Sequence, residues 1–183
     1  MHESVQYTDL ALRRFFARVS REPWFDRTLF VVTADHVSSE VTLPEYKTPW
    51  GKYAVPILFY QKDMPAVFDT LRTAQQTDIL PTVMSRLNFD KPFVAFGKDL
   101  FSAGDSTAFN YAAPAYQLMT SDGMLRHDGK SALGFFDYRR DRRMQRNLLD
   151  GLPPTKRNML EGQLKARIQQ YNNRMVENRL IIR

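Results

Sequence analysis

The sequence predicts an α/β fold followed by a small antiparallel part and a final helix. Three observations lead to this prediction. An amphipathic helical pattern precedes a short apolar run near residue 30, a second apolar run and a second helix follow, and tight-turn signals gather after residue 115. A helix followed by a buried strand is typical of α/β layering. With 183 residues, 43% of them hydrophobic, the chain is long enough to fill a core.

The first predicted element is a helix over residues 7–20. Its apolar positions recur at helical spacing and are Ala11, Leu12, Phe15, Phe16 and Val19. Glu22 and Pro23 end this helix, and Trp24 and Phe25 are expected to pack over its end. Leu29 to Val32 is continuously apolar, which predicts a strand buried on both faces, as in a parallel sheet.

A long loop is predicted over residues 37–52, because Pro44, Pro49 and Gly51 interrupt it, and loops of this length are often functional. Residues 54–60 resume the sheet, and residues 77–87 form a helix with Pro81 in its first turn. Thr77 or Asp78 is expected to cap that helix. Asp78 is therefore interpreted as structural and not as a catalytic acid or base.

Residues 116–138 are predicted to form an antiparallel meander with turns at Asp122-Gly123 and Asp128-Gly129. His127 precedes the second turn and is interpreted as a solvated turn histidine. After Pro153 and Pro154 a last helix begins. Its apolar stripe is expected to pack in the core and consists of Leu160, Leu164, Ile168, Tyr171 and Met175.

Composition limits the classes of function. The chain has no cysteine, so disulfides and thiolate metal sites are excluded, and any metal must use oxygen and nitrogen ligands. No apolar run reaches the roughly 20 residues of a membrane span. The net charge of +6 comes from scattered arginines and predicts a solvated surface and no nucleic-acid partner. The five arginines between 139 and 146 suggest a hypothesis of contact with anionic lipid headgroups or an anionic polymer.

Asp35 and His36 come directly after the first predicted strand. In an open α/β sheet, ligands gather outside the carboxyl ends of the strands, where this pair is expected. A carboxylate and an imidazole offer oxygen and nitrogen ligands to divalent metals such as zinc or manganese. The structural alternative is a capping carboxylate beside a surface histidine.

Four segments in this order resemble a known family: "TLFVVTADHVSSE", "YKTPWGKYAVPILFY", "QQTDILPTVMSRL" and "FGKDLFS". Together they resemble the C-terminal half of the sulfatase catalytic domain in the alkaline phosphatase superfamily, and most closely the lipoteichoic acid synthase and phosphoglycerol transferase group. The resemblance implies a partial alkaline phosphatase-like sheet flanked by helices over residues 1–110. An antiparallel subdomain over 111–152 and a C-terminal helix over 153–183 would follow.

The resemblance also implies a chemistry. Asp35 and His36 match the family's metal-binding pair, so we expect a divalent metal, manganese or zinc, with calcium or magnesium as alternatives. Lys47 and Lys52 lie on the loop that faces the expected pocket, where their charges could hold a phosphate or sulfate ester. Val37 follows the histidine where sulfatases often have glycine, which favours the transferase-like branch.

No residue of this sequence matches the family's nucleophile. We therefore expect a C-terminal fragment of a larger enzyme, inactive alone, that requires the N-terminal part of the same enzyme. Full-length relatives imply a membrane-anchored enzyme with an extracytoplasmic catalytic domain, whereas this fragment is expected to be soluble and to self-associate through an exposed sheet edge. The alternatives are an arylsulfatase or phosphodiesterase-type hydrolase, and a non-catalytic module that binds anionic glycans or lipids.

Overall fold

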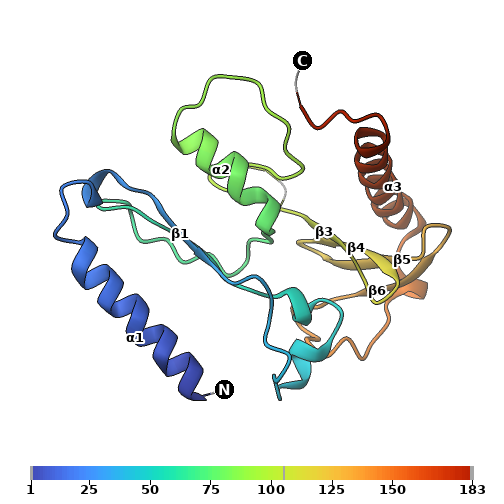
Figure 1. The fold of residues 1–183 in the computed structure, drawn as a ribbon. Coiled ribbons are helices and arrows are strands. Elements are labelled where there is room, and N and C mark those ends of the chain that lie inside the picture. Colours follow the sequence, from blue (N-terminus) through green and yellow to red (C-terminus); the bar gives the residue numbers. More distant parts are fainter. Residues whose placement is uncertain (1, 105, 182–183) are drawn as a thin grey trace. The chain divides into compact units, whose positions relative to one another are not determined.

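The computed structural model describes residues 2–104 and 106–181, which fall into two compact units (Figure 1). The first unit comprises Met1–Lys47 and Gly51–Phe68, and the second comprises Thr48–Trp50 and Asp69–Arg183. Each unit combines helices with an antiparallel sheet, so the predicted α/β fold class is confirmed.

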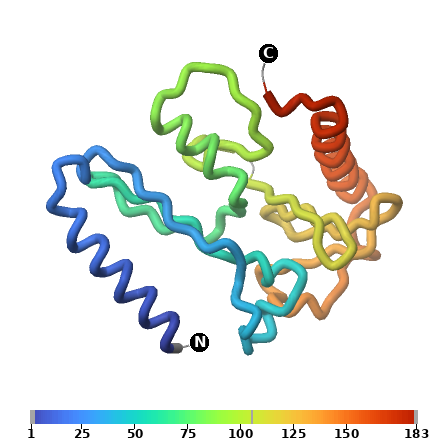
Figure 2. The backbone as a smooth tube through the Cα atoms, in the orientation of Figure 1, coloured from blue at the N-terminus to red at the C-terminus, as the bar shows by residue number. Residues whose placement is uncertain are grey.

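The first unit is built from helix α1 (His2–Val19) and a sheet of two strands, β1 (Phe30–Thr33) and β2 (Ile57–Tyr60). The two strands run side by side in opposite directions, in the register Phe30↔Tyr60 to Thr33↔Ile57 (Figure 2). The prediction of a parallel-sheet strand buried on both faces is therefore wrong for β1. Leu29 to Val32 are only half-buried, and the strand that pairs with β1 runs antiparallel to it.

An aromatic cluster forms the core of the first unit around Phe30. Its ring centroid lies 5.3 Å from both Phe16 of α1 and Phe25, and 6.1 Å from Tyr60 of β2. Trp24 lies 6.4 Å away, so Trp24 and Phe25 pack beyond the end of α1 as predicted. Such tilted and edge-on pairs each stabilise by about 1 kcal/mol beyond their buried area.

The second unit contains helix α2 (Ile79–Arg86), a four-stranded meander and helix α3 (Pro154–Val176). The strands are β3 (Ala108–Ala112), β4 (Ala115–Thr120), β5 (Gly123–His127) and β6 (Ala132–Phe136), each antiparallel to the next. The two predicted turns connect β4 to β5 and β5 to β6, and Gly129 has a φ of +103°, which favours glycine. The meander begins earlier than predicted, at Ala108.

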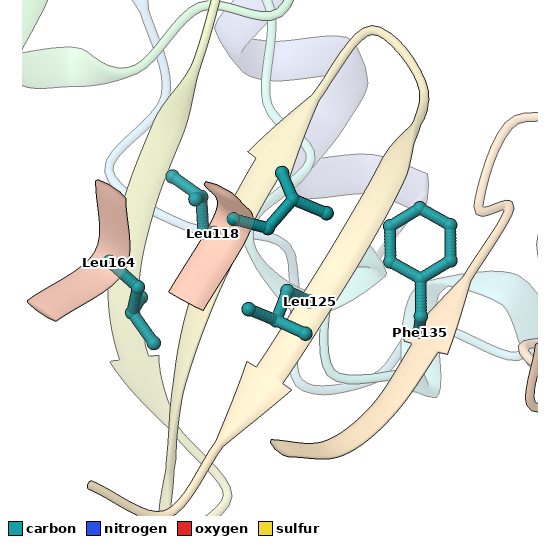
Figure 3. Packing of buried hydrophobic residues seen from close by; sticks show 5 residues of the cluster. Leu118, Leu125, Phe135 and Leu164 are labelled. Carbon is teal, nitrogen blue, oxygen red and sulfur yellow. The ribbon is translucent and has the colours of Figure 1, made fainter. Parts of the chain in front are cut away.

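Helix α3 closes one face of this meander. Leu118, Leu125 and Phe135 lie in register across β4, β5 and β6, and they pack with Leu160 and Leu164 of α3 (Figure 3). Both leucines of α3 are at most 2% exposed, which confirms this part of the predicted stripe. Its far end departs from the prediction: Tyr171 and Met175 are both 46% exposed, because they lie beyond the last residues that pack against the core.

A short 3-10 helix, η4 (Gln76–Asp78), leads into α2 and carries the buried Asp78. Its carboxylate accepts hydrogen bonds from the backbone N–H groups of Gln75 and Lys98, each at 2.9 Å. This side chain accepts no hydrogen bond from the first N–H groups of α2, so the prediction that Asp78 caps α2 is wrong. The interpretation of Asp78 as structural is nevertheless borne out, because its carboxylate holds two chain segments together.

The segment 97–100 lies against the start of α2. Thr82 Oγ1 accepts from the Leu100 N–H at 2.9 Å. A Cβ at Gly97 would lie 2.1 Å from the carbonyl oxygen of Thr77, so only glycine allows this approach. Among the residues described, no helix is both long and apolar enough to cross a bilayer.

Candidate functional site

The Asp35–His36 pair lies just beyond the end of β1. Thr33 Oγ1 donates a hydrogen bond to the carbonyl of Pro56 at 2.8 Å, which ties the end of β1 to the residue that precedes β2. The Asp35 and His36 side chains are 86% and 66% exposed. Strand β1 therefore delivers a carboxylate and an imidazole to the surface at an anchored strand end.

The two side chains face each other. His36 Nε2 lies 3.2 Å from Asp35 Oδ2, while Asp35 Oδ1 accepts from the His36 backbone N–H at 2.9 Å. On the other side of the ring, Nδ1 lies 2.9 Å from the carbonyl oxygen of Val37. A carbonyl oxygen only accepts, so Nδ1 is the donor in this contact, and Nε2 is the ring nitrogen that faces the Asp35 carboxylate.

This arrangement fits a bound cation. Metal-binding histidines usually donate their second ring N–H to a carbonyl or carboxylate, as Nδ1 of His36 donates to Val37. Nε2 faces a carboxylate oxygen 3.2 Å away, so these two atoms can share a proton or a cation between them. Two ligands of one tetrahedral zinc ion lie about 3.4 Å apart, given bonds of about 2.1 Å. The observed separation is close to that value.

The pair supplies only part of a metal site. Within residues 2–104 and 106–181, no group of three or more His, Cys, Asp or Glu side chains comes together. Protein-bound zinc usually has three or four protein ligands, and Ca²⁺ and Mg²⁺ take six or more ligands in all. The residues present therefore fit half of a metal site, and further ligands would have to come from elsewhere.

Lys47 and Lys52 lie on two short 3-10 helices, η2 (Pro44–Lys47) and η3 (Gly51–Tyr53). The two helices pack so closely that a Cβ at Gly51 would lie 1.9 Å from the carbonyl oxygen of Glu45. Both lysines are exposed, and neither forms an ion pair with any residue in the described part of the chain. Their role at a substrate stays a prediction.

His127 differs most from its interpretation. The side chain is fully buried at the end of β5, so the prediction of a solvated turn histidine is wrong. Its Nδ1 accepts from the Gly129 N–H at 2.9 Å, and its Nε2 lies 3.7 Å from Oε2 of Glu161 on α3. The alternation of Leu125 and His127 along β5 could have indicated this burial, because both side chains lie on the face that α3 covers.

Glu161 is held in its charged form. Arg157 donates a hydrogen bond to this carboxylate at 2.9 Å and, with support from His127 and Lys165, holds the pKa of Glu161 below its usual value against the opposing effect of burial. The cluster joins α3 to the meander, so we interpret His127 and Glu161 as structural residues.

Comparison with solved structures shows which known fold this chain shares. A solved chain from Vibrio parahaemolyticus, described as a protein in the alkaline phosphatase superfamily, matches with a TM-score of 0.79 and 22% sequence identity. The match covers 98% of the present chain and 42% of the solved chain, so the present chain spans less than half of that protein.

A second comparison agrees with the predicted resemblance. The family model named Sulfatase matches residues 2–89, slightly less than half of the chain. The matched range contains Asp35, His36, Lys47 and Lys52. No curated protein matches the chain. The closer likeness to lipoteichoic acid synthases stays a prediction.

Proposed function

We propose that this chain is the C-terminal part of a metal-dependent, sulfatase-fold enzyme that acts on phosphate or sulfate esters. The reaction we favour is transfer of phosphoglycerol or phosphoethanolamine to glycans or lipids of the cell envelope. The nucleophile would belong to a preceding part of the polypeptide, so the chain by itself would be inactive. The full-length enzyme would be membrane-anchored with an extracytoplasmic catalytic domain.

One observation carries the proposal. Within the segment that matches the sulfatase family, the end of β1 presents Asp35 Oδ2 and His36 Nε2 at 3.2 Å, with the second ring nitrogen of His36 held by a backbone carbonyl. Enzymes of this superfamily generally use divalent metals. The two residues would hold such an ion, manganese or zinc in the first place, with calcium or magnesium as alternatives.

The chemistry follows from the charge of the substrate. An anionic ester repels an incoming nucleophile, and a bound divalent ion supplies positive charge that lowers the nucleophile's pKa and offsets the charge of the transition state. Asp35 and His36 would orient the ion through their fixed side chains. Lys47 and Lys52, which have no ion pair within the described residues, would attract the ester's non-reacting oxygens.

Isothermal titration of the chain with Mn²⁺ and Zn²⁺ tests this proposal. We expect Asp35→Ala and His36→Ala each to weaken metal affinity about tenfold or more, because each removes one ligand from an incomplete site. Asp9→Ala is the matched control, since Asp9 is also an exposed carboxylate, 70% exposed, and lies on α1. Metal affinity that is unchanged in all three variants would contradict the proposal.

The second candidate is a non-catalytic module that binds anionic glycans or lipids. The exposed lysines Lys47 and Lys52 support it, because cationic side chains can hold an anionic ligand without a metal. The two candidates differ in their dependence on metal. A chain joined to the preceding part of its polypeptide should release or transfer a phosphoglycerol group only with metal present if it is an enzyme. Sulfate release from an aryl sulfate would instead indicate the hydrolase.

A further inference from the structure

A second surface, remote in sequence from Asp35 and His36, is the segment Asp137–Arg146, which we call the arginine turn. It holds five arginines, two aspartates and no lysine in ten residues. Arg140, Arg142, Arg143 and Arg146 are exposed. Only Arg140 of these four has an ion pair with a described residue, at 3.8 Å to Asp137. Three guanidinium groups are thus available to an external anion.

The backbone of the arginine turn is held in place by its own hydrogen bonds. Asp137 accepts from the N–H groups of Arg140 and Asp141, the latter at 2.8 Å. Asp141 accepts in turn from the Arg146 N–H at 2.8 Å and, through its carbonyl, from Met144 at 2.9 Å. In both aspartates one carboxylate oxygen therefore accepts from a backbone N–H of the turn. That oxygen is less able to pair with an arginine side chain.

The turn is also anchored to the rest of its unit. Trp50 Nε1 donates to the Arg142 carbonyl at 3.0 Å, and the Trp50 ring lies 5.5 Å from that of Tyr138. The Tyr138 hydroxyl donates to the Thr120 carbonyl at 3.1 Å. Arg139, in contrast to the exposed arginines, donates to Thr73 Oγ1 and lies over the Tyr138 ring. Arg139 is therefore part of the anchor, and binding to the turn would require little ordering of the backbone.

The residue type indicates the ligand. Guanidinium groups present a planar fork of N–H donors that matches two oxygens of a phosphate or sulfate, which the ammonium group of lysine does not. Several guanidinium groups on one turn can bind several anionic groups at once. They therefore suit a polymer that carries one anionic group on each repeating unit. Within the described residues of the arginine turn no large apolar side chain is exposed, although Leu71, whose carbonyl oxygen accepts a hydrogen bond from Arg139, is 73% exposed. The turn itself therefore presents charge and no apolar side chain, whereas proteins that insert into bilayers usually present apolar side chains.

We propose that the arginine turn, which shares no residue with the Asp35–His36 pair, is a docking surface for a linear polymer of phosphate or sulfate esters. The inference rests on the proposed function for its choice of partner. An enzyme that acts on anionic envelope polymers would bind its substrate more tightly through a second binding surface for the polymer. Binding itself requires neither a metal nor Asp35 and His36, so it can be measured in EDTA.

The test is binding of the chain to inorganic polyphosphate in EDTA, measured by fluorescence anisotropy at several salt concentrations. We expect the triple variant Arg142→Gln, Arg143→Gln, Arg146→Gln to bind about tenfold or more weakly and with a smaller dependence on salt, because fewer counterions are released. The corresponding Arg→Lys triple variant should recover only part of the affinity, because it restores charge without the planar fork.

The matched control removes the same charge from α1 and the turn that follows it, through Arg14→Gln, Arg18→Gln and Arg21→Gln, which are exposed arginines of the other unit. This control should bind polyphosphate like the unaltered chain. Equal weakening by both triple variants would show a general effect of net charge and would overturn the proposal, as would no weakening by either. Circular dichroism confirms that each variant is folded.

Two further measurements separate the polymer from other macromolecules. Vesicles of phosphatidylglycerol and duplex DNA should each bind more weakly than polyphosphate at equal phosphate concentration. Tighter binding to either one, lost in the Gln triple variant of the arginine turn, would assign this surface to a membrane or a nucleic acid and overturn the polymer proposal. Asp35→Ala should lose metal binding and keep its polyphosphate binding. This result would show that the metal site and the arginine turn act independently, so failure of one proposal can be told apart from failure of the other.

Discussion

The Nε2 of His127 on β5 lies 3.7 Å from Oε2 of Glu161 on α3, so a buried imidazole faces a charged carboxylate across the interface of sheet and helix. Glu161 is only 17% exposed, and it also accepts a hydrogen bond from Arg157. The meander and α3 are therefore joined by a polar contact as well as by their leucine core.

Glu161→Gln should destabilise the chain by about 1–2 kcal/mol at pH 7, because the amide oxygen can at best accept a neutral hydrogen bond from Arg157 in place of the charge-assisted one. The pKa of Glu161 is lowered in the folded state, first by the Arg157 hydrogen bond, so its stabilisation is present above its unfolded pKa of about 4.3 and is lost as the pH falls through the folded value. The difference between variant and unaltered chain should therefore shrink at pH 3. Urea unfolding at both pH values measures it.

The control is Glu177→Gln, an exposed carboxylate just after α3, which should change stability by less than about 0.5 kcal/mol. If Glu161→Gln lost the same stability at pH 7 and pH 3, the contribution of Glu161 would come from packing and not from its charge.

Gly97→Ala should destabilise the second unit by about 2–4 kcal/mol, because the new Cβ would lie 2.1 Å from a backbone oxygen that cannot easily move. Gly162→Ala is the matched control. Gly162 lies within α3 with no atom within 4 Å of the added Cβ, so this change should stabilise by about 0.5–1 kcal/mol. Thermal unfolding followed by circular dichroism gives both values, and a neutral Gly97→Ala would refute the close approach.

Leu164→Ala should cost about 2–5 kcal/mol, because this side chain is fully buried between α3 and the meander and its removal leaves a cavity. Met159→Ala on the same helix removes a 51% exposed side chain and should cost less than about 1 kcal/mol. Denaturant unfolding of the two variants compares them directly. Equal losses would mean that α3 does not depend on the buried stripe.

Self-association is expected of the first unit. Within the described residues its sheet holds only β1 and β2, so each strand has an edge without a strand partner. An apolar groove of about 530 Å³, lined in part by Leu12, Phe16, Val32 and Leu58, opens beside the sheet. Open edges and apolar surface favour association.

Leu58→Lys should therefore lower the apparent mass in sedimentation at high protein concentration, because a charge at a 53% exposed position of β2 opposes pairing. Leu87→Lys, at a 65% exposed position after α2, should leave the mass unchanged. A monomeric unaltered chain at high concentration would contradict the expectation.

Sequence patterns predicted the helices better than the strand pairing. The spacing of Leu160 and Leu164 in α3 repeats at the helical period and identifies the buried face without knowledge of the partner. In α1 the same spacing identified the helix, but of its predicted apolar positions only Val19 is buried, while Leu12 and Phe15 are 42% and 46% exposed. The run Phe30–Thr33 has no such period. A short apolar run predicts a strand, but its direction depends on a partner 24 or more residues away, and for this reason parallel pairing was the wrong expectation.

In the candidate sites, too, local features could be predicted from the sequence and long-range contacts could not. The Asp35–His36 pair is local, so its place after a strand could be predicted from the sequence, and the structure adds the hydrogen bond from Nδ1 to Val37. The burial of His127 depends on α3, which begins 27 residues later, and the neighbouring Asp-Gly turn signal favoured exposure. The role of Asp78 likewise needs Lys98, which lies 20 residues away.

The contact of Asp78 and Thr82 with the segment 97–100 has a consequence for dynamics. The amides of Lys98 and Leu100 donate to side chains that are themselves fully shielded from solvent, although this segment forms neither helix nor strand. Deuterium exchange at these two amides should therefore be slow, comparable to that of the paired strands. A stretch that looks like a simple connection would then unfold only together with the start of α2.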